Sequence, residues 1–243
     1  MFHFDPAYLL FVALPLLVIT GLAHLWVKVS YARYSKVGNA RGITGAEAAK
    51  YILHAEGLDN VRVEPVEGWL SDHYSPKELV LRLSPQNYSG TSIAAVGIAA
   101  HEAGHAIQHA RRYAPLALRN IAVPMASIGS GFGYLVIVIG LAMSGGRNVI
   151  TPLTLIGLGL IASVALFQIV NLPVEFDASR RALQVLPRLG ILSGDENRAA
   201  RNVLVAAAMT YVAATLAAIA ELLYWAWRLG LLGGSRDSDS NRT

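Results

Sequence analysis

The amino-acid sequence predicts a mainly α-helical membrane protein, with four transmembrane helices and a smaller cytoplasmic α+β region. The chain has 243 residues, of which 54% are hydrophobic and only 15% are charged, whereas about a quarter of the residues of soluble domains are charged. The apolar residues are gathered in four stretches long enough to cross a bilayer, which takes about 20 residues. The composition therefore excludes an ordinary soluble globular protein.

The four predicted transmembrane helices cover residues 8–29, 121–143, 149–170 and 203–229. The first follows the acidic Asp5 and has no basic residue before it, unlike a cleaved signal peptide, so we expect it to be retained. The short link Ser144–Asn148 makes the second and third helices an antiparallel pair. The tail at 233–243 is polar and is predicted to be disordered.

The distribution of Lys and Arg predicts the orientation in the membrane. Sixteen of the 20 basic residues lie between Lys28 and Arg119 or between residues 171 and 202, and four lie elsewhere. The positive-inside rule then places the segments 30–120 and 171–202 in the cytoplasm and both termini outside. No stripe of basic residues typical of nucleic-acid binding is present, so the predicted partner of the chain is the lipid bilayer.

The larger polar segment, 30–120, has the patterns of both helices and strands. The capping box Thr44–Glu47 predicts a helix that ends near Gly57. Alternating residues at 61–64 and 78–83 predict two strands, which we expect to form a small β-hairpin. A helix is predicted from about Ser92 to Arg112.

The smaller polar segment, 171–202, is predicted to contain two helical starts. Pro173 fits the first turn of a helix that continues to about Leu186. The capping-box pattern Ser193–Glu196 predicts a second helix that runs directly into the fourth span.

An H-E-x-x-H motif lies in the predicted helix at His101–His105. Residues four apart share one face of a helix, so His101 and His105 can bind the same metal ion. Glu102, next to the first of these ligands, can take a proton from a water molecule activated by the metal. The motif is typical of zinc hydrolases and makes Zn²⁺ the predicted cofactor.

The motif leaves the third zinc ligand undetermined. A catalytic zinc usually has three protein ligands, and the chain has no cysteine, so the third is a histidine or a carboxylate. His109 is rotated by roughly 80° around the helix from His101 and points elsewhere. Glu175 and Asp177, soon after the third span, are the candidates, although either can instead pair with the arginines that follow.

The chain resembles the bacterial YugP-type neutral zinc metallopeptidases over nearly its whole length. The resemblance rests on four segments: Trp69–Tyr74, Leu81–Pro85, Ala99–Gln108 and Leu172–Ser179. It implies a membrane-embedded gluzincin-like peptidase, with a cytoplasmic metalloprotease domain. In the similar HtpX-type and CAAX-type endopeptidases, the Glu of an E-x-x-A-D motif on a second helix is the third ligand. This resemblance implies Glu175 as the third ligand.

The motif departs from that of these relatives at one position. Ser179 stands where the Asp that orients a ligand histidine would be. A hydrogen-bond acceptor for a ligand histidine is expected on physical grounds. Whether Asp177, Ser179 or neither has this role stays open at the level of sequence.

The resemblance implies a zinc-dependent endopeptidase of the bacterial inner (plasma) membrane, acting at its cytoplasmic face. Its polypeptide substrates would be membrane or unfolded proteins, in quality control by analogy with HtpX-type enzymes. Glu102 would be the general base, and His73, in the polar turn Ser71–Tyr74, is the candidate for stabilising the oxyanion. The sequence does not decide whether a homo-oligomer or a membrane adaptor protein takes part.

Two other functions are each compatible with part of the sequence. A site-2-type intramembrane protease is favoured by Asn171 and Pro173 followed by Asp177, but its zinc helix crosses the membrane. Here the apolar run Ile93–Ala100 before the motif is too short to do so. A non-catalytic membrane scaffold with a vestigial metal site is the second alternative, and the presence of Glu102 beside a full ligand set counts against it.

Overall fold

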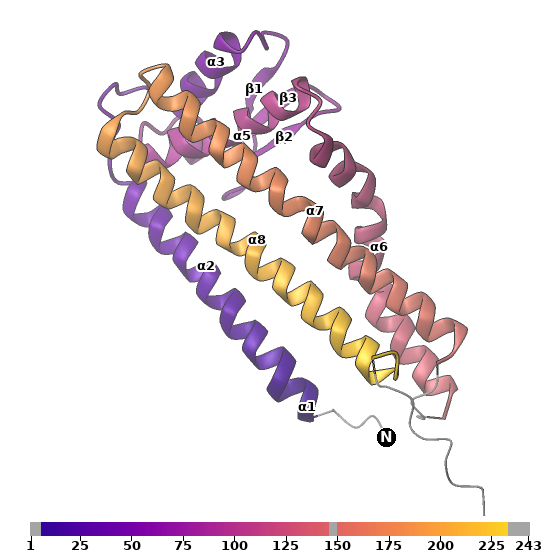
Figure 1. Cartoon of the computed structure of the whole chain (residues 1–243). Coiled ribbons are helices and arrows are strands. Elements are labelled where there is room, and N and C mark those ends of the chain that lie inside the picture. The colour runs from indigo at the N-terminus through magenta and orange to yellow at the C-terminus, as the bar shows by residue number, and fades with distance from the viewer. Residues whose placement is uncertain (1–5, 146–149, 233–243) are drawn as a thin grey trace, which may run out of the picture. The chain divides into compact units, whose positions relative to one another are not determined.

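The computed structural model describes residues 6–145 and 150–232 and is mostly helical (Figure 1). It divides into two compact units. Unit 1 comprises residues up to 19, 120–169 and from 213 onward, and unit 2 comprises 20–119 and 170–212. The tail predicted at 233–243 and most of the predicted link at 144–148 lie outside the described residues.

Four helical stretches are long and apolar enough to cross a membrane: Pro6–Tyr34, Ala114–Met143 (α6), Pro152–Arg188 (α7) and Gly194–Arg228 (α8). The first consists of α1 (Pro6–Tyr8), a π-helical turn (Leu9–Ala13) and α2 (Leu14–Tyr34). All four predicted spans are thus helical. Each helix is longer than its predicted span because its more polar end continues into unit 2.

In unit 1, α6 and the first part of α7 pack as an antiparallel pair. A Cβ atom on Gly129 would lie 2.3 Å from the carbonyl oxygen of Leu160, and one on Gly140 would lie 3.0 Å from the backbone nitrogen of Thr154. Because glycine has no side chain at these two positions, the backbones of α6 and α7 approach closely. The predicted antiparallel arrangement is confirmed. In the same unit, the Tyr8 hydroxyl of α1 donates to Glu221 of α8 at 2.9 Å.

Unit 2 is built around α5 (Ile93–Ala110), which packs against α3 (Gly45–Ala55), α4 (Pro85–Tyr88) and a small sheet (Figure 1). The predicted capping box of α3 is present, with reciprocal hydrogen bonds between Thr44 and Glu47. The core of this unit contains fully buried apolar side chains from both the helices and the sheet. Among them are Ile52, Leu81, Leu83, Val96, Leu186 and Ile191.

The prediction that the strands at 61–64 and 78–83 form a β-hairpin is wrong in the direction of their pairing. β1 (Arg62–Pro65) and β3 (Val80–Leu83) are neighbours but run parallel, and β2 (His73–Ser75) pairs antiparallel on the other side of β3. Alternation along a strand has the same period in either direction, so it does not fix the direction of pairing. The connection between β1 and β3 exceeds the dozen or so residues that a parallel crossover needs.

The predicted helical start at Pro173 is also wrong, because α7 continues through this residue. Proline removes one N–H donor from the helix, and side chains of neighbouring elements form further hydrogen bonds to backbone carbonyls beside it. Gln108 Nε2 donates to the carbonyl oxygen of Val174 at 2.8 Å, and the Tyr113 hydroxyl donates to that of Pro173 at 3.5 Å. The predicted start of the last helix near Ser193 is confirmed by α8.

Two glycines of α5 lie against neighbouring helices. A Cβ on Gly104 would lie 2.6 Å from the carbonyl oxygen of Ala178 on α7, which is too close for any real contact. A Cβ on Gly97 would lie 3.3 Å from the Cβ of Ala200 on α8, which is only tight. Gly104 therefore sets the separation between α5 and α7.

We predict that Gly104→Ala destabilises the protein more than Gly97→Ala. Overpacking costs about 1–3 kcal/mol, and the gain in helix propensity from Gly to Ala, about 1 kcal/mol, is the same at both positions. Thermal unfolding of both variants in the same detergent measures the difference. A melting temperature for Gly104→Ala at or above that of Gly97→Ala would contradict the close packing.

Candidate metal centre

Two helices of unit 2 bring three metal-binding side chains to one point. α5 carries His101 and His105 one turn apart, and α7 carries Glu175. Glu175 Oε2 lies 3.3 Å from His101 Nε2 and 3.7 Å from His105 Nε2. One potential ligand atom from each of the three residues lies within 4.8 Å of the others, so this group could hold a metal ion.

Hydrogen bonds on the far side of each imidazole fix its orientation. His101 Nδ1 lies 3.0 Å from the hydroxyl of Ser179, and His105 Nδ1 lies 3.0 Å from Gln108 Oε1. The Gln108 amide nitrogen is already donating, to Val174 and to Asp177, so its oxygen accepts from His105. A neutral His105 therefore presents an unprotonated Nε2 to Glu175.

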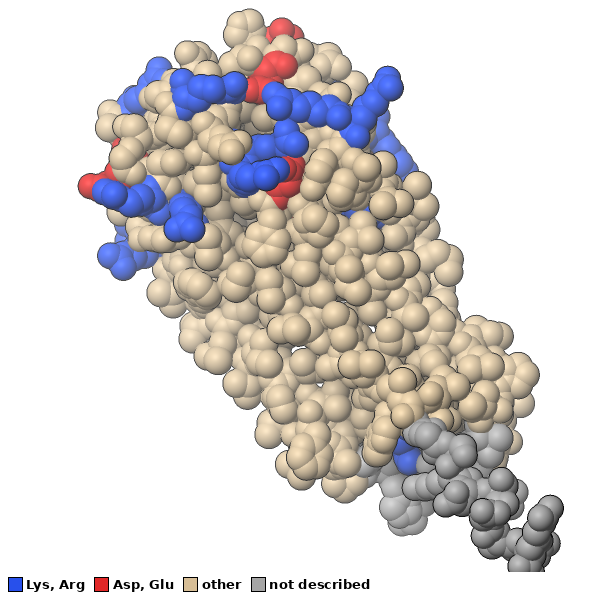
Figure 2. Space-filling model, viewed as in Figure 1, with Lys and Arg blue, Asp and Glu red and all other residues tan. Residues whose placement is uncertain are grey.

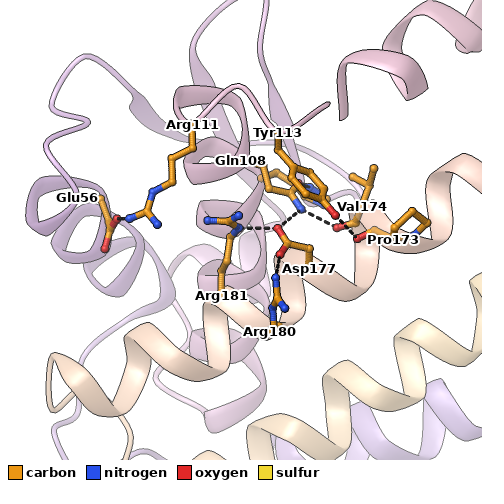
Figure 3. Close-up of polar contacts among 10 residues, drawn as sticks. Glu56, Gln108, Arg111, Tyr113, Pro173, Val174, Asp177, Arg180 and Arg181 are labelled. Atoms are coloured by element: carbon orange, nitrogen blue, oxygen red, sulfur yellow. Dashed lines mark hydrogen bonds and ion pairs between the residues drawn. The ribbon is translucent and has the colours of Figure 1, made fainter. Parts of the chain in front are cut away.

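Asp177 holds Gln108, the residue that orients His105, in place through a hydrogen bond. Its buried carboxylate accepts from Gln108 Nε2 at 3.0 Å, from Arg181 Nε at 2.5 Å and from Arg180 (Figure 3). The oxygens of this carboxylate are thus directed at the amide and the two guanidinium groups. Of the two acidic candidates from the sequence, only Glu175 joins the group that could hold a metal.

The Glu175 carboxylate is buried beside the two imidazoles. Glu175 is 3% exposed, and its Oε2 has no satisfactory hydrogen bond within the described part of the chain. Burial disfavours a charged His105, but its interactions with Glu175, Glu102 and Gln108 outweigh burial and raise the pKa of His105. A buried carboxylate facing the unprotonated Nε2 of a neutral His105 is costly, and a proton or a metal cation between them would offset that cost.

Glu102 lies next to this group and is nearly buried, with 8% of its surface exposed. Burial raises the pKa of its carboxyl above the usual range, and the two neighbouring histidines reduce this effect. A carboxylate of raised pKa is a stronger base. Together with His101 and Glu175, it lines a cavity of about 290 Å³.

The structure does not bring His73 to this group. Its imidazole is exposed on β2, with Nδ1 2.8 Å from the carbonyl oxygen of Ser71. The cavity is lined instead by the preceding residue, Asp72, and neighbours along an extended chain point to opposite sides. The position of His73 gives no support to the expected oxyanion role. His109 likewise lies apart, hydrogen-bonded through Nδ1 to the Tyr74 hydroxyl at 2.9 Å.

Three residues of the site were not singled out from the sequence. Gln108 orients His105, Tyr211 of α8 lines the cavity and is hydrogen-bonded to Glu175, and Asp72 forms part of the rim. Gln108 follows His105 by three residues, a spacing that places both on one helix face. That spacing is the one local signal that could have identified it.

Comparisons with known proteins show which family the chain belongs to. Residues 9–230 match the family described as "putative neutral zinc metallopeptidase". The chain is 42% identical over 216 residues to the "Putative membrane protease YugP" of Bacillus subtilis (strain 168), covering 88% of this chain and 93% of that protein. No solved structure matches the chain significantly. Because the family match spans nearly all of its length, the chain belongs to the neutral zinc metallopeptidase family.

Proposed function

We propose that this protein is a zinc-dependent endopeptidase of the membrane, with His101, His105 and Glu175 as the zinc ligands and Glu102 as the general base. The observation that carries the proposal is the buried convergence of two imidazole nitrogens and one carboxylate on a single point. The donor set of two His and one Glu is one that catalytic zinc uses. The membrane protease relative supports peptide hydrolysis as the reaction.

The residues around the site fit a hydrolytic mechanism. Zinc, when bound, supplies Lewis acidity that makes water acidic near neutral pH and polarises a carbonyl group. Glu102 would accept the proton of the attacking water and return it to the leaving amine. Ser179 and Gln108 would hold the two imidazoles with their Nε2 atoms directed at the metal.

The charge distribution supports a site at the cytoplasmic face of a bacterial inner membrane. Figure 2 shows Lys and Arg side chains gathered on unit 2. Among the described residues of unit 1, only Glu221 and Arg228 are charged. The positive-inside rule then directs unit 2, with the site, to the cytoplasm. Membrane or unfolded polypeptides, handled in quality control, are the proposed substrates.

Neither alternative function gains support from the site. α5 is not one of the four stretches suited to crossing a membrane in the part of the chain described, which argues against a site-2-type enzyme. A structural zinc site is normally closed by a fourth protein ligand. The group described here has three, and it opens onto a cavity, which favours catalysis over a scaffold role.

We predict that Glu175→Ala abolishes zinc binding, whereas Asp177→Ala still binds zinc at saturating metal. Only the first substitution removes a ligand, because the Asp177 carboxylate is directed at Gln108 and the arginines. Zinc per chain, measured by mass spectrometry on purified protein, distinguishes the two, with circular dichroism to check folding. Zinc loss in Asp177→Ala alone would reverse the assignment.

We predict that Gln108→Leu weakens zinc binding by about 10–100-fold, the range found when a group that orients a ligand is lost. Leucine fills the buried space but cannot accept from His105 Nδ1. Competition with a chelator measures the affinity. Gln86→Leu on the exposed face of α4 is the matched control, and equal affinities for the two variants would refute the orienting role.

We predict that Glu102→Gln keeps zinc but loses peptidase activity by about 10²–10⁴-fold, because glutamine cannot accept the water proton. Cleavage of an unfolded protein in detergent and the zinc content are measured on the same samples. Glu78→Gln, which alters an exposed carboxylate on the loop before β3, is the control. A Glu102→Gln enzyme that cuts as well as wild type would remove Glu102 from the mechanism.

A further inference from the structure

The cavity beside the metal centre has two chemically different walls. One wall consists of the site itself, with His101, Glu102 and Glu175 from α5 and α7. The rest of the lining comes mainly from α2 and α8 and is mostly apolar, with His24, Thr210 and Tyr211 among its polar members. Its side chains, together with those of α5 and the loop before β2, include Val27, Leu70, Ile98, Val203, Ala207 and Ala208. A group bound at the metal would therefore have an apolar surface directly beside it.

From these two walls we infer that the cavity is a specificity pocket for one large apolar side chain of the substrate, at the residue next to the scissile bond. The inference rests on the proposed peptidase function. Pockets that bind a whole drug-sized molecule measure about 300–1,000 Å³. The cavity, of about 290 Å³, is at the lower limit of this range and has room for one large side chain and the peptide group beside it.

The apolar wall is held in place independently of any substrate. Leu70 has a φ of +52°, in the left-handed region that non-glycine residues rarely adopt. It is kept there by packing against the buried cluster of Tyr31, Ala94 and Val203. A pocket whose wall is formed beforehand binds a side chain without the entropic cost of ordering that wall.

The polar rim of the cavity is also fixed. The Asp72 carboxylate accepts from the backbone nitrogen of Ser84 at 2.8 Å and from Asn87 Nδ2 at 2.9 Å. Asn87 is fully buried and in turn accepts from the Tyr31 hydroxyl of α2 at 3.1 Å. These bonds tie the rim to α2 and occupy the Asp72 carboxylate, so it is not free to bind a charged substrate side chain.

Two small residues on α8 leave room in the cavity for a substrate side chain. Ala207 and Ala208 face the cavity, and Val27 of α2 lines it as well. A larger side chain at Val27 or Ala207 would fill the pocket without touching the proposed ligands. On the same helix as Val27, Val29 is exposed and does not line the cavity, so it offers a matched control.

The test uses zinc-loaded full-length protein in detergent and four peptide hydroxamates. They carry hydrogen, methyl, isobutyl or aminobutyl as the side chain next to the metal-binding group, and calorimetry gives each Kd. We expect the isobutyl compound to bind at least about tenfold more tightly than the methyl one, since each buried methylene contributes roughly fourfold. Val27→Phe and Ala207→Phe should abolish this preference, and Val29→Phe should retain it.

The outcomes separate this inference from the proposed function. Equal binding of all four compounds, or tightest binding of the aminobutyl compound, would overturn the apolar pocket while leaving the metal site intact. Failure of every hydroxamate to bind, or failure of the protein to take up zinc, would instead overturn the proposed function and this inference with it. If both Val27→Phe and Ala207→Phe still bind the isobutyl compound more tightly than the methyl one, the preference comes from partition into detergent. That result would overturn the pocket.

Discussion

The close approach of α5 to α7 is the constraint on which the site depends. Gly104, which has no side chain, lies against the backbone of Ala178, and this contact holds the Nε2 atoms of two histidines within 3.7 Å of a carboxylate oxygen on the other helix. A buried carboxylate is costly unless it is hydrogen-bonded or paired with a positive charge. The apolar packing of unit 2 therefore holds a geometry that a cation between these groups would stabilise.

The groups that orient the two imidazoles are neutral, and this affects the expected metal chemistry. A carboxylate hydrogen-bonded to a ligand histidine raises the basicity of the ligand. Here a serine hydroxyl and a glutamine amide occupy these places, while the negative charge of Asp177 is compensated by Arg180 and Arg181. Less basic imidazoles donate less charge, so a bound metal would stay a stronger Lewis acid at some cost in affinity.

Local patterns in the sequence predicted the features that depend on local physics. Long apolar stretches predicted the four membrane-suited helices, and the spacing of His101 and His105 placed both on one helix face. The direction of β1 relative to β3 was not predictable, because alternation carries no information on direction. Continuation of α7 through Pro173 was missed because proline is tolerated both in a first helical turn and inside membrane helices, so the residue alone does not mark a helix start.

Local sequence patterns also could not predict the residues of the apolar wall, because these residues lie far apart in the chain. The H-E-x-x-H motif, which includes Glu102, is continuous in the chain, but the apolar wall joins residues of α2 and α8 that share no motif. These wall residues line the cavity without belonging to the group that could hold a metal. Substitutions in the wall can therefore change which side chain fits while the ligands and base stay in place. Under the proposed function, chemistry would depend on α5 and α7 and selectivity mainly on α2 and α8, and only the chemistry would have a recognisable sequence pattern.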